Sequence, residues 1–229
     1  AKELLTSLIP ALLQAFSNTA NPNATLGRFD RFLSNLPTGV QLFSMLKAHP
    51  QLLEMLAEIM GSAPRLANYL SENSTVVDAM ISAEFHDAPS MLRVLRGEFN
   101  QALAQAADFQ DILDLTRRHV KERKFQIGVQ ILGRTIDADL SGTCYADLAE
   151  VSLSPLLSKV REAFAVEERH GHIAGGAMVA LAMGKLGSRE LTAESDLDLI
   201  FIYDYPGLNA VSDGERPLPA QQYFSRLSQ

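Results

Sequence analysis

The sequence predicts a mainly α-helical N-terminal domain followed by the start of an α/β domain. Apolar residues recur at helical spacing through most of the chain up to about residue 170. The stretch from Gly175 to Asp204 reads instead as an apolar strand, a glycine-containing turn, a polar connection and a second apolar strand. A hydrophobic content of 47% with 21% charged residues is ordinary for a globular protein with a sizeable core.

Length and composition limit the classes to which this chain can belong. Its 229 residues suffice for one large or two small domains. It contains no long apolar run and no cleavable leader, so we expect a soluble, cytoplasmic chain with no membrane partner. The single cysteine, Cys144, fits a reducing compartment and is interpreted as a packing residue. The net charge of −7 argues against nucleic acid as a partner, because nucleic-acid binding usually needs an excess of Lys and Arg.

Residues 1–23 are predicted to form an N-terminal helix and a linker. Apolar residues follow helical spacing as far as Phe16, and Pro10 should kink or restart that helix. The segment 18–24, NTANPNA, is rich in turn residues and therefore predicts a linker into the next domain.

Residues 24–141 are predicted to form a helical domain. One long helix or two nearly collinear helices are expected over 109–136, and this segment carries a basic cluster. We interpret the cluster as a solvated face; the alternative is attraction of an acidic partner or of nucleotide phosphates. The cluster comprises Arg117, Arg118, His119, Lys121, Arg123 and Lys124. Shorter helices, which share helical apolar spacing and turn residues at their ends, are expected at 26–36, 50–60, 64–70 and 91–106.

Residues 142–229 are predicted to form a second domain, which opens with an amphipathic helix over 143–168. His170 and His172 are placed at the C-terminal end of this helix, where imidazoles complement the helix dipole. No further Cys or His lies at zinc-ligand spacing from them. Asp137 and Asp139, a first D-x-D pair, fall at a helix end and are not expected to share a metal ion.

The chemistry of the second domain is expected in the segment that ends with a second D-x-D pair. Asp196 and Asp198 open the second predicted strand, where alternate side chains share a face about 6–7 Å apart. Two carboxylates so placed can hold metal ions for phosphoryl transfer. Upstream, Gly187 and Ser188 offer backbone N–H groups that can approach a phosphate closely. The alternative is an ordinary buried strand whose acidic start faces water.

The segment GKLGSRELTAESDLDLIFIYD resembles the nucleotidyltransferase signature of the glutamine-synthetase adenylyltransferase (glutamate-ammonia-ligase adenylyltransferase) family. The likeness extends over nearly the whole chain, including the helical segment that begins ATLGRFDRFLSNL and the join RHGHIAGG. The family usually carries Gly-Gly where this chain has Gly187 and Ser188, and serine keeps the small size there. Residues 192–195 are more similar to the second, adenylylating half of these bifunctional enzymes than to the deadenylylating half.

The resemblance implies an α/β nucleotidyltransferase-superfamily domain over 142–229 that transfers AMP from ATP to a tyrosine of glutamine synthetase. Asp196 and Asp198 would act as catalytic metal ligands for Mg²⁺, while Gly187, Ser188 and Lys185 would contact the ATP phosphates. In the parent bifunctional enzyme the AMP group is also removed, and the cycle regulates nitrogen assimilation.

The resemblance also implies partners and an incomplete site. Glutamine synthetase and a nitrogen-signalling regulatory protein would bind the full-length enzyme. Superfamily members carry a third metal-binding carboxylate on a later strand, which would lie beyond Gln229, so the 229 residues alone are expected to be folded but inactive. Two alternatives stay open: a nucleotidyltransferase acting on another acceptor, and a non-catalytic helical regulatory or interaction fragment.

Overall fold

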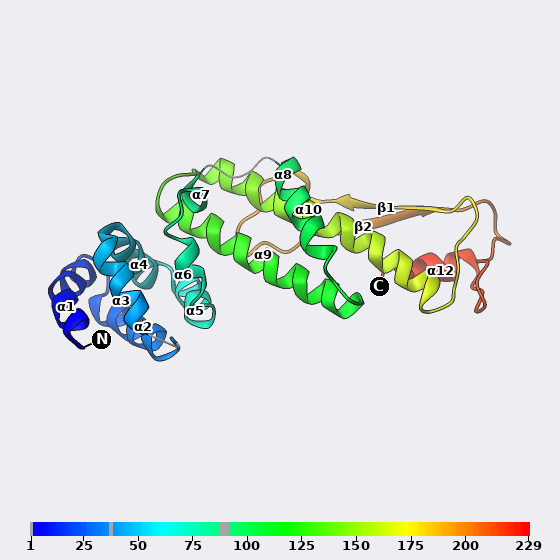
Figure 1. Ribbon diagram of the computed structural model, residues 1–229. Coiled ribbons are helices and arrows are strands. Elements are labelled where there is room, and N and C mark those ends of the chain that lie inside the picture. Colours follow the sequence, from blue (N-terminus) through cyan, green and yellow to red (C-terminus); the bar gives the residue numbers. More distant parts are fainter. Residues whose placement is uncertain (1, 37–38, 88–91) are drawn as a thin grey trace. The chain divides into compact units, whose positions relative to one another are not determined.

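The computed structural model describes residues 2–36, 39–87 and 92–229. Within these ranges the chain forms twelve helices and one two-stranded antiparallel sheet (Figure 1). It divides into two compact units, one of residues 1–89 and 124–137 and the other of residues 90–123 and 138–229. The predicted mainly helical chain with a late β element is confirmed, whereas the nucleotidyltransferase fold of the later part stays a prediction.

Short helices surround an extended apolar core in the first unit. Phe32, Leu56 and Leu70 are fully buried in this core, and Phe125 and Val129 of α9 (Phe109–Leu132) belong to it as well. The other helices of the unit are α1 (Lys2–Ser17), α2 (Pro22–Ser34), α3 (Gly39–Ala48), α4 (Pro50–Ser62), α5 (Pro64–Glu72), α6 (Val76–Ala79) and α7 (Ala83–His86).

Proline residues mark several helix starts in the first unit. Pro22, Pro50 and Pro64 lie at the first turns of α2, α4 and α5, where a backbone N–H has no helical partner to lose. Pro10, by contrast, lies inside α1, and the helix runs on to Ser17. Of the two outcomes predicted at Pro10, the restart is therefore wrong, and a kink stays a prediction.

The linker between α1 and α2 is shorter than predicted. The side chain of Asn21 accepts a hydrogen bond from the backbone N–H of Ala24 at 3.1 Å. This cap satisfies one of the free N–H groups of the first turn and starts α2 at Pro22. The turn-rich composition of residues 18–24 therefore includes the start of a helix.

In the second unit, helices come first and the sheet follows. Its elements are α8 (Leu92–Leu103), the N-terminal part of α9, α10 (Ala138–Val166), β1 (Ala177–Ala182), α11 (Gly184–Gly187), β2 (Leu199–Asp204) and α12 (Ala220–Leu227). The predicted start of α8 at residue 91 lies outside the described residues. α9 is one continuous helix, which confirms the single-helix alternative. The domain boundary predicted after residue 141 falls inside α10, and that division stays a prediction.

β1 and β2 pair in an antiparallel register that runs from Ala177 opposite Asp204 to Ala182 opposite Leu199 (Figure 1). The inner face of this sheet contributes Met178 and Tyr203 to an apolar cluster with α12. The outer face exposes four large apolar side chains: Val179, Leu181, Ile200 and Ile202, between 46% and 58% exposed. The sheet is therefore covered on one face only.

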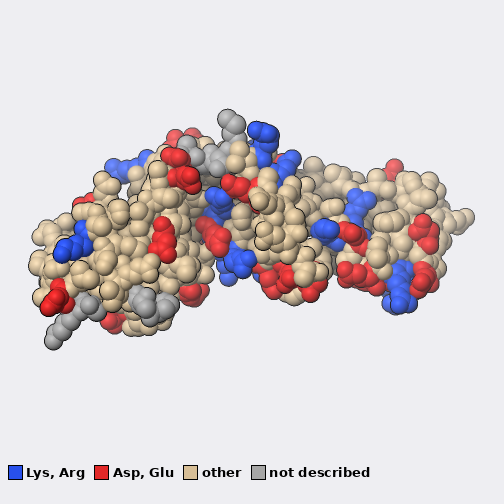
Figure 2. All heavy atoms as spheres, in the orientation of Figure 1, with Lys and Arg blue, Asp and Glu red and all other residues tan. Residues whose placement is uncertain are grey.

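Charged residues are intermingled on the face of the molecule that Figure 2 shows, where basic and acidic groups often lie side by side. Two members of the basic cluster of α9 have acidic partners: Arg117 pairs with Asp114 at 2.9 Å, and Arg123 pairs with Glu98. These pairs support the interpretation of the cluster as a solvated face except at His119, whose ring packs against Phe99 of α8. Among the helices described, none combines the length and the apolar composition needed to cross a membrane.

Candidate functional site

The turn after β1 brings a glycine against an aspartate. The chain leaves β1 at Ala182 and enters the single helical turn α11, whose first residue, Gly184, has φ +51°. A Cβ atom on Gly184 would lie 2.7 Å from Oδ2 of Asp198, a distance that real Cβ atoms do not tolerate. Glycine therefore suits this position because of the left-handed backbone, and the missing Cβ leaves room for the carboxylate, which would otherwise have to move aside.

Asp196 and Asp198 precede β2 and do not lie in it. Ala182, the last residue of β1, pairs with Leu199, and beyond it the chain turns away into α11. One further backbone bond, from Met183 N–H to the Asp198 carbonyl at 2.9 Å, extends the pairing. The prediction that the second strand opens at Asp196 is therefore wrong, because the partner strand ends too early. Both aspartates are exposed.

Gly187 and Ser188 lie at the end of α11, close to the end of β1. A Cβ on Gly187 would lie 2.8 Å from the Ala182 carbonyl oxygen, so this glycine permits the tight return of the chain. The Gly187 and Ser188 N–H groups donate to the carbonyls of Met183 and Gly184, each at 3.0 Å. Both amides therefore donate hydrogen bonds within the turn. The exposed polar group of this pair of residues is the Ser188 hydroxyl.

The polar side chains of the turn are accessible. The Ser188 hydroxyl donates to the Glu190 carboxylate at 2.8 Å, in an exposed position. Lys185 is exposed on the same turn. Its backbone carbonyl accepts a bond from Glu190 N–H at 2.8 Å, which closes the turn after α11.

The donor set of this region fits a magnesium ion shared with a substrate. In the described ranges no group of three or more His, Cys, Asp or Glu side chains is placed to hold a metal ion. Mg²⁺ typically binds one or two protein carboxylates and completes its shell with water and substrate phosphates. Two exposed aspartates beside an open glycine turn match that mode of binding rather than an all-protein cage.

An anchor that the sequence analysis missed holds this turn on α10. Arg189, which follows Ser188, forms ion pairs with Asp147 and with Glu150, the latter at 3.4 Å. Leu186 and Leu191, on either side of it, are buried at 7% and 4% exposure. Sequence spacing carries no signal for these pairs, because the partners lie about 40 residues apart.

His170, predicted to lie at the end of α10, bonds elsewhere. α10 ends at Val166, and the buried His170 ring bonds through Nδ1 to the Arg216 carbonyl at 2.7 Å. A Cβ on Gly171 would lie 2.2 Å from the backbone nitrogen of Gly214, so this glycine lets the two segments touch. The predicted role of the histidines at a helix end is wrong; His170 fastens the loop that leads to α12.

Cys144 and Tyr145 on α10 behave as core residues. Both are buried, and burial raises the pKa of the Cys144 thiol. Burial likewise raises the pKa of Tyr145 to about 12. A thiol with a raised pKa is a poor nucleophile, which agrees with the packing role predicted for Cys144.

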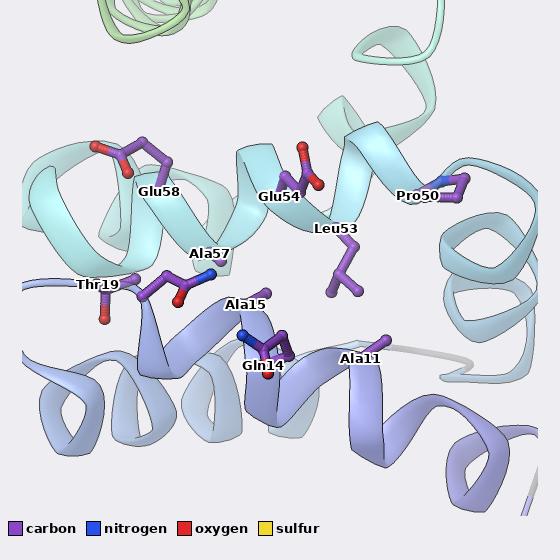
Figure 3. A pocket seen from close by; sticks show the side chains of 10 residues that line it. Ala11, Gln14, Ala15, Thr19, Pro50, Leu53, Glu54, Ala57 and Glu58 are labelled. Carbon is purple, nitrogen blue, oxygen red and sulfur yellow. The ribbon is translucent and has the colours of Figure 1, made fainter.

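A groove in the first unit does not involve the predicted site residues. It lies between α1 and α4 and has a volume of about 370 Å³ (Figure 3). Small side chains such as Ala11, Ala15 and Ala57 line it. Glu54 and Glu58 of α4 also line the groove, and in Figure 3 their side chains extend from the side of α4 that faces away from α1.

Comparison with known proteins places the chain in one family. Residues 53–229 match the family described as Glutamate-ammonia ligase adenylyltransferase. The whole chain is 43% identical to a bifunctional glutamine synthetase adenylyltransferase/adenylyl-removing enzyme of Brucella suis biovar 1 (strain 1330), and 43% identical to one of Mesorhizobium japonicum. A protein of the same name from Rhizobium meliloti is 38% identical. The chain spans 23% of the length of each of these relatives. With a family match over more than half its length, the chain belongs to the glutamate-ammonia ligase adenylyltransferase family.

Proposed function

We propose that this chain is part of an enzyme that transfers AMP from ATP to a tyrosine of glutamine synthetase. The observation that carries the proposal is the contact between Asp198 and Gly184, which joins the D-x-D segment to the glycine turn after β1. The names of the relatives, glutamine synthetase adenylyltransferase/adenylyl-removing enzymes, supply the reaction and the acceptor. On this proposal, residues 142–229 belong to a nucleotidyltransferase-superfamily domain.

Asp196 and Asp198 would hold Mg²⁺ together with the triphosphate of ATP. The ion would supply positive charge to the phosphate oxygens while the tyrosine oxygen attacks the α-phosphorus and pyrophosphate departs. The backbone of Asp198 is held by the bond from Met183 N–H to its carbonyl, and its carboxylate lies close to Gly184. Asp196 is two residues away in the same segment.

Ser188, Gly187 and Lys185 would bind the phosphates of ATP. Because the Gly187 and Ser188 amides are used within the turn, we assign the direct contact to the Ser188 hydroxyl, which would exchange Glu190 for a phosphate oxygen. Gly187 would act by keeping the turn tight against Ala182. The exposed Lys185 ammonium would add a charge-assisted bond.

The full enzyme would also remove AMP and bind a nitrogen-signalling regulatory protein. We assign this chain to the adenylylating half on the sequence of residues 192–195. We place the enzyme in the cytoplasm, where its acceptor is a metabolic enzyme, and we propose that a later strand of the longer polypeptide supplies a third carboxylate.

The test uses a polypeptide as long as the relatives and carrying this sequence. Asp196→Asn and Asp198→Asn should each lower AMP transfer to glutamine synthetase by about a hundredfold or more, because a catalytic metal stabilises the reacting charge by several kcal/mol. Asp204→Asn is the matched control: Asp204 lies at the far end of β2, and its Oδ1 accepts a bond from the N–H of Tyr205, an acceptor that asparagine keeps. The control should retain wild-type turnover.

The outcomes separate the alternatives. Near-wild-type turnover by either Asp→Asn variant would remove that residue from the site. AMP transfer to some other protein but not to glutamine synthetase would establish a different acceptor. An absence of magnesium-dependent ATP binding by the full-length protein would leave a regulatory or interaction role.

A further inference from the structure

Arg189 adopts a backbone conformation that arginine does not favour. Its φ is 61°, and its position directly after the last turn of α11 is one where glycine is usual. Its own N–H donates to the Leu186 carbonyl at 3.2 Å, and the next N–H, of Glu190, donates to Lys185. This bonding pattern needs a left-handed residue, and an L-residue with a Cβ is strained in that conformation. Interactions of the Arg189 side chain must therefore offset this strain.

The side chain of Arg189 forms ion pairs with two acidic residues of α10. Its guanidinium bonds the Asp147 carboxylate through Nη2 and approaches Glu150 through Nη1 at 3.4 Å. Glu150 also accepts a bond from Arg96 of α8 at 2.8 Å, so four charged side chains form one network. The Asp147 side chain is 19% exposed and that of Arg189 is 41% exposed, so this pair is partly shielded from solvent. A glycine at position 189 would relax the backbone and lose the ion pairs with Asp147 and Glu150 of α10.

The backbone around Arg189 is also seated on α10. A Cβ on Gly142, in the second turn of α10, would lie 3.2 Å from the Arg189 carbonyl oxygen and 3.2 Å from the Cα of Glu190. The absence of that Cβ lets the turn lie directly on the helix. With Leu186 and Leu191 buried on either side, ion pairs and apolar contacts fix the same short segment.

We propose that Arg189 is a positioning residue that holds the ATP-binding turn on α10 through Asp147 and Glu150. The inference rests on the proposed function, because it assigns the turn to ATP. Arg189 follows Ser188 directly, and the same turn begins at Gly184, against which the Asp198 carboxylate lies. Fixing the end of the turn therefore fixes both the Ser188 hydroxyl and the contact surface of Asp198, without Arg189 touching the substrate.

Two other arginines provide matched controls. Arg134 (φ 57°) and Arg169 (φ 62°) are the other non-glycine residues with positive φ among those the structure describes. Arg169 forms an exposed ion pair with Glu215 at 3.2 Å, away from the turn. Replacing either by glycine removes the same side chain from the same backbone conformation without affecting the turn at residues 184–190.

The test measures AMP transfer by the full-length enzyme and hydrogen exchange of the amides over residues 184–191. We expect Arg189→Gly to raise the KM for ATP about tenfold with a smaller change in kcat, because the binding groups are displaced rather than removed. Exchange over 184–191 should accelerate by a similar factor. Arg189→Lys should give an intermediate KM. The charge-reversed pair Arg189→Asp with Asp147→Arg should recover part of the loss that Arg189→Asp causes alone.

The controls decide how each result is read. Arg134→Gly and Arg169→Gly should keep the KM for ATP within about twofold of wild type, since neither side chain contacts the turn. A wild-type KM and wild-type exchange in Arg189→Gly, or an equal loss in Arg169→Gly, would overturn the positioning role. If the wild-type enzyme transfers no AMP, the proposed function is wrong. The anchoring role is tested separately by hydrogen exchange: unchanged exchange in Arg189→Gly would show that Arg189 does not anchor the turn.

Discussion

The two compact units of this chain differ in where they place their large apolar side chains. In the first unit these side chains meet in an extended core, with Phe32, Leu56 and Ile59 at 0% exposure. In the second unit the sheet buries only its inner face, and Val179 and Ile202 stay about half exposed on the outer one. The candidate site residues all belong to this second unit: Lys185 and Gly187 lie in α11, Ser188 directly follows it, and Asp196 and Asp198 precede β2. The first unit is built as a well-packed helical scaffold, whereas the chemistry we propose for the second unit depends on a few close backbone contacts.

The largest stability effect is expected in the first unit. Leu56→Ala should lower the free energy of unfolding by about 2–5 kcal/mol, because it leaves a cavity in a fully buried position of α4. Leu13→Ala deletes the same atoms from a side chain that is 57% exposed and should change the stability by less than about 0.5 kcal/mol. Urea denaturation of the chain measures both. Equal losses would show that α4 does not lie in a well-packed core.

Below its unfolding temperature, Leu56→Ala should leave AMP transfer by the full-length enzyme unchanged. This second measurement shows whether the stability of the first unit can be lowered without changing the activity proposed for the second unit. A large fall in kcat for a folded Leu56→Ala enzyme would mean that the first unit takes part in the reaction.

The next effect concerns the contact that defines the candidate site. Gly184→Ala forces a Cβ into a left-handed residue, at about 1–2 kcal/mol, and places it 2.7 Å from the Asp198 carboxylate. Gly207→Ala is the matched control: Gly207 also has positive φ, +96°, but a Cβ there meets nothing within 4 Å. The two variants should therefore lose similar stability, whereas only Gly184→Ala should lose AMP transfer, by about tenfold or more. Equal AMP transfer by both variants would show that the close approach of Gly184 to Asp198 is not needed for activity.

The helices of both units could be predicted from the sequence, for a clear physical reason. Apolar residues such as Phe29 and Phe32 on α2 recur at the period of the helix and turn toward the core. The predictions were wrong at helix boundaries, where a single local contact determines where a helix begins or ends. The Asn21 cap starts α2 within a stretch that reads as linker, and α1 continues through Pro10.

The candidate site was predicted less completely than the helices, because its geometry depends on contacts between distant residues. D-x-D spacing assigns Asp196 and Asp198 to a strand, but β2 starts only where β1 offers a partner, at Leu199. The role of Gly184 depends on the approach of a side chain 14 residues later in the sequence. Arg189 was overlooked, because a left-handed arginine carries none of the compositional signal that glycine gives.

The smallest effect is expected from the pH dependence of a histidine in the second unit. His119 on α9 packs edge-on against Phe99 of α8, with ring centroids 5.1 Å apart. Its Nε2 is buried without a hydrogen-bond partner among the described residues. Burial lowers the pKa of His119 below its ordinary value of 6.5, and the neighbouring Arg123 lowers it further, while Glu98 partly offsets both.

A lowered pKa in the folded state fixes the sign of the pH dependence. The folded chain binds a proton at His119 less readily than the unfolded chain does, so the contribution of His119 is complete above pH 6.5 and declines as the pH falls below it. His119→Gln should flatten the decrease in stability between pH 7 and pH 5 measured by urea denaturation, relative to wild type. The exposed His49 provides a matched control for the histidine-to-glutamine change. A steeper slope in His119→Gln would mean that the Glu98 carboxylate, rather than burial, dominates the site, and α8 and α9 would then be held together by a charged histidine instead of a neutral one.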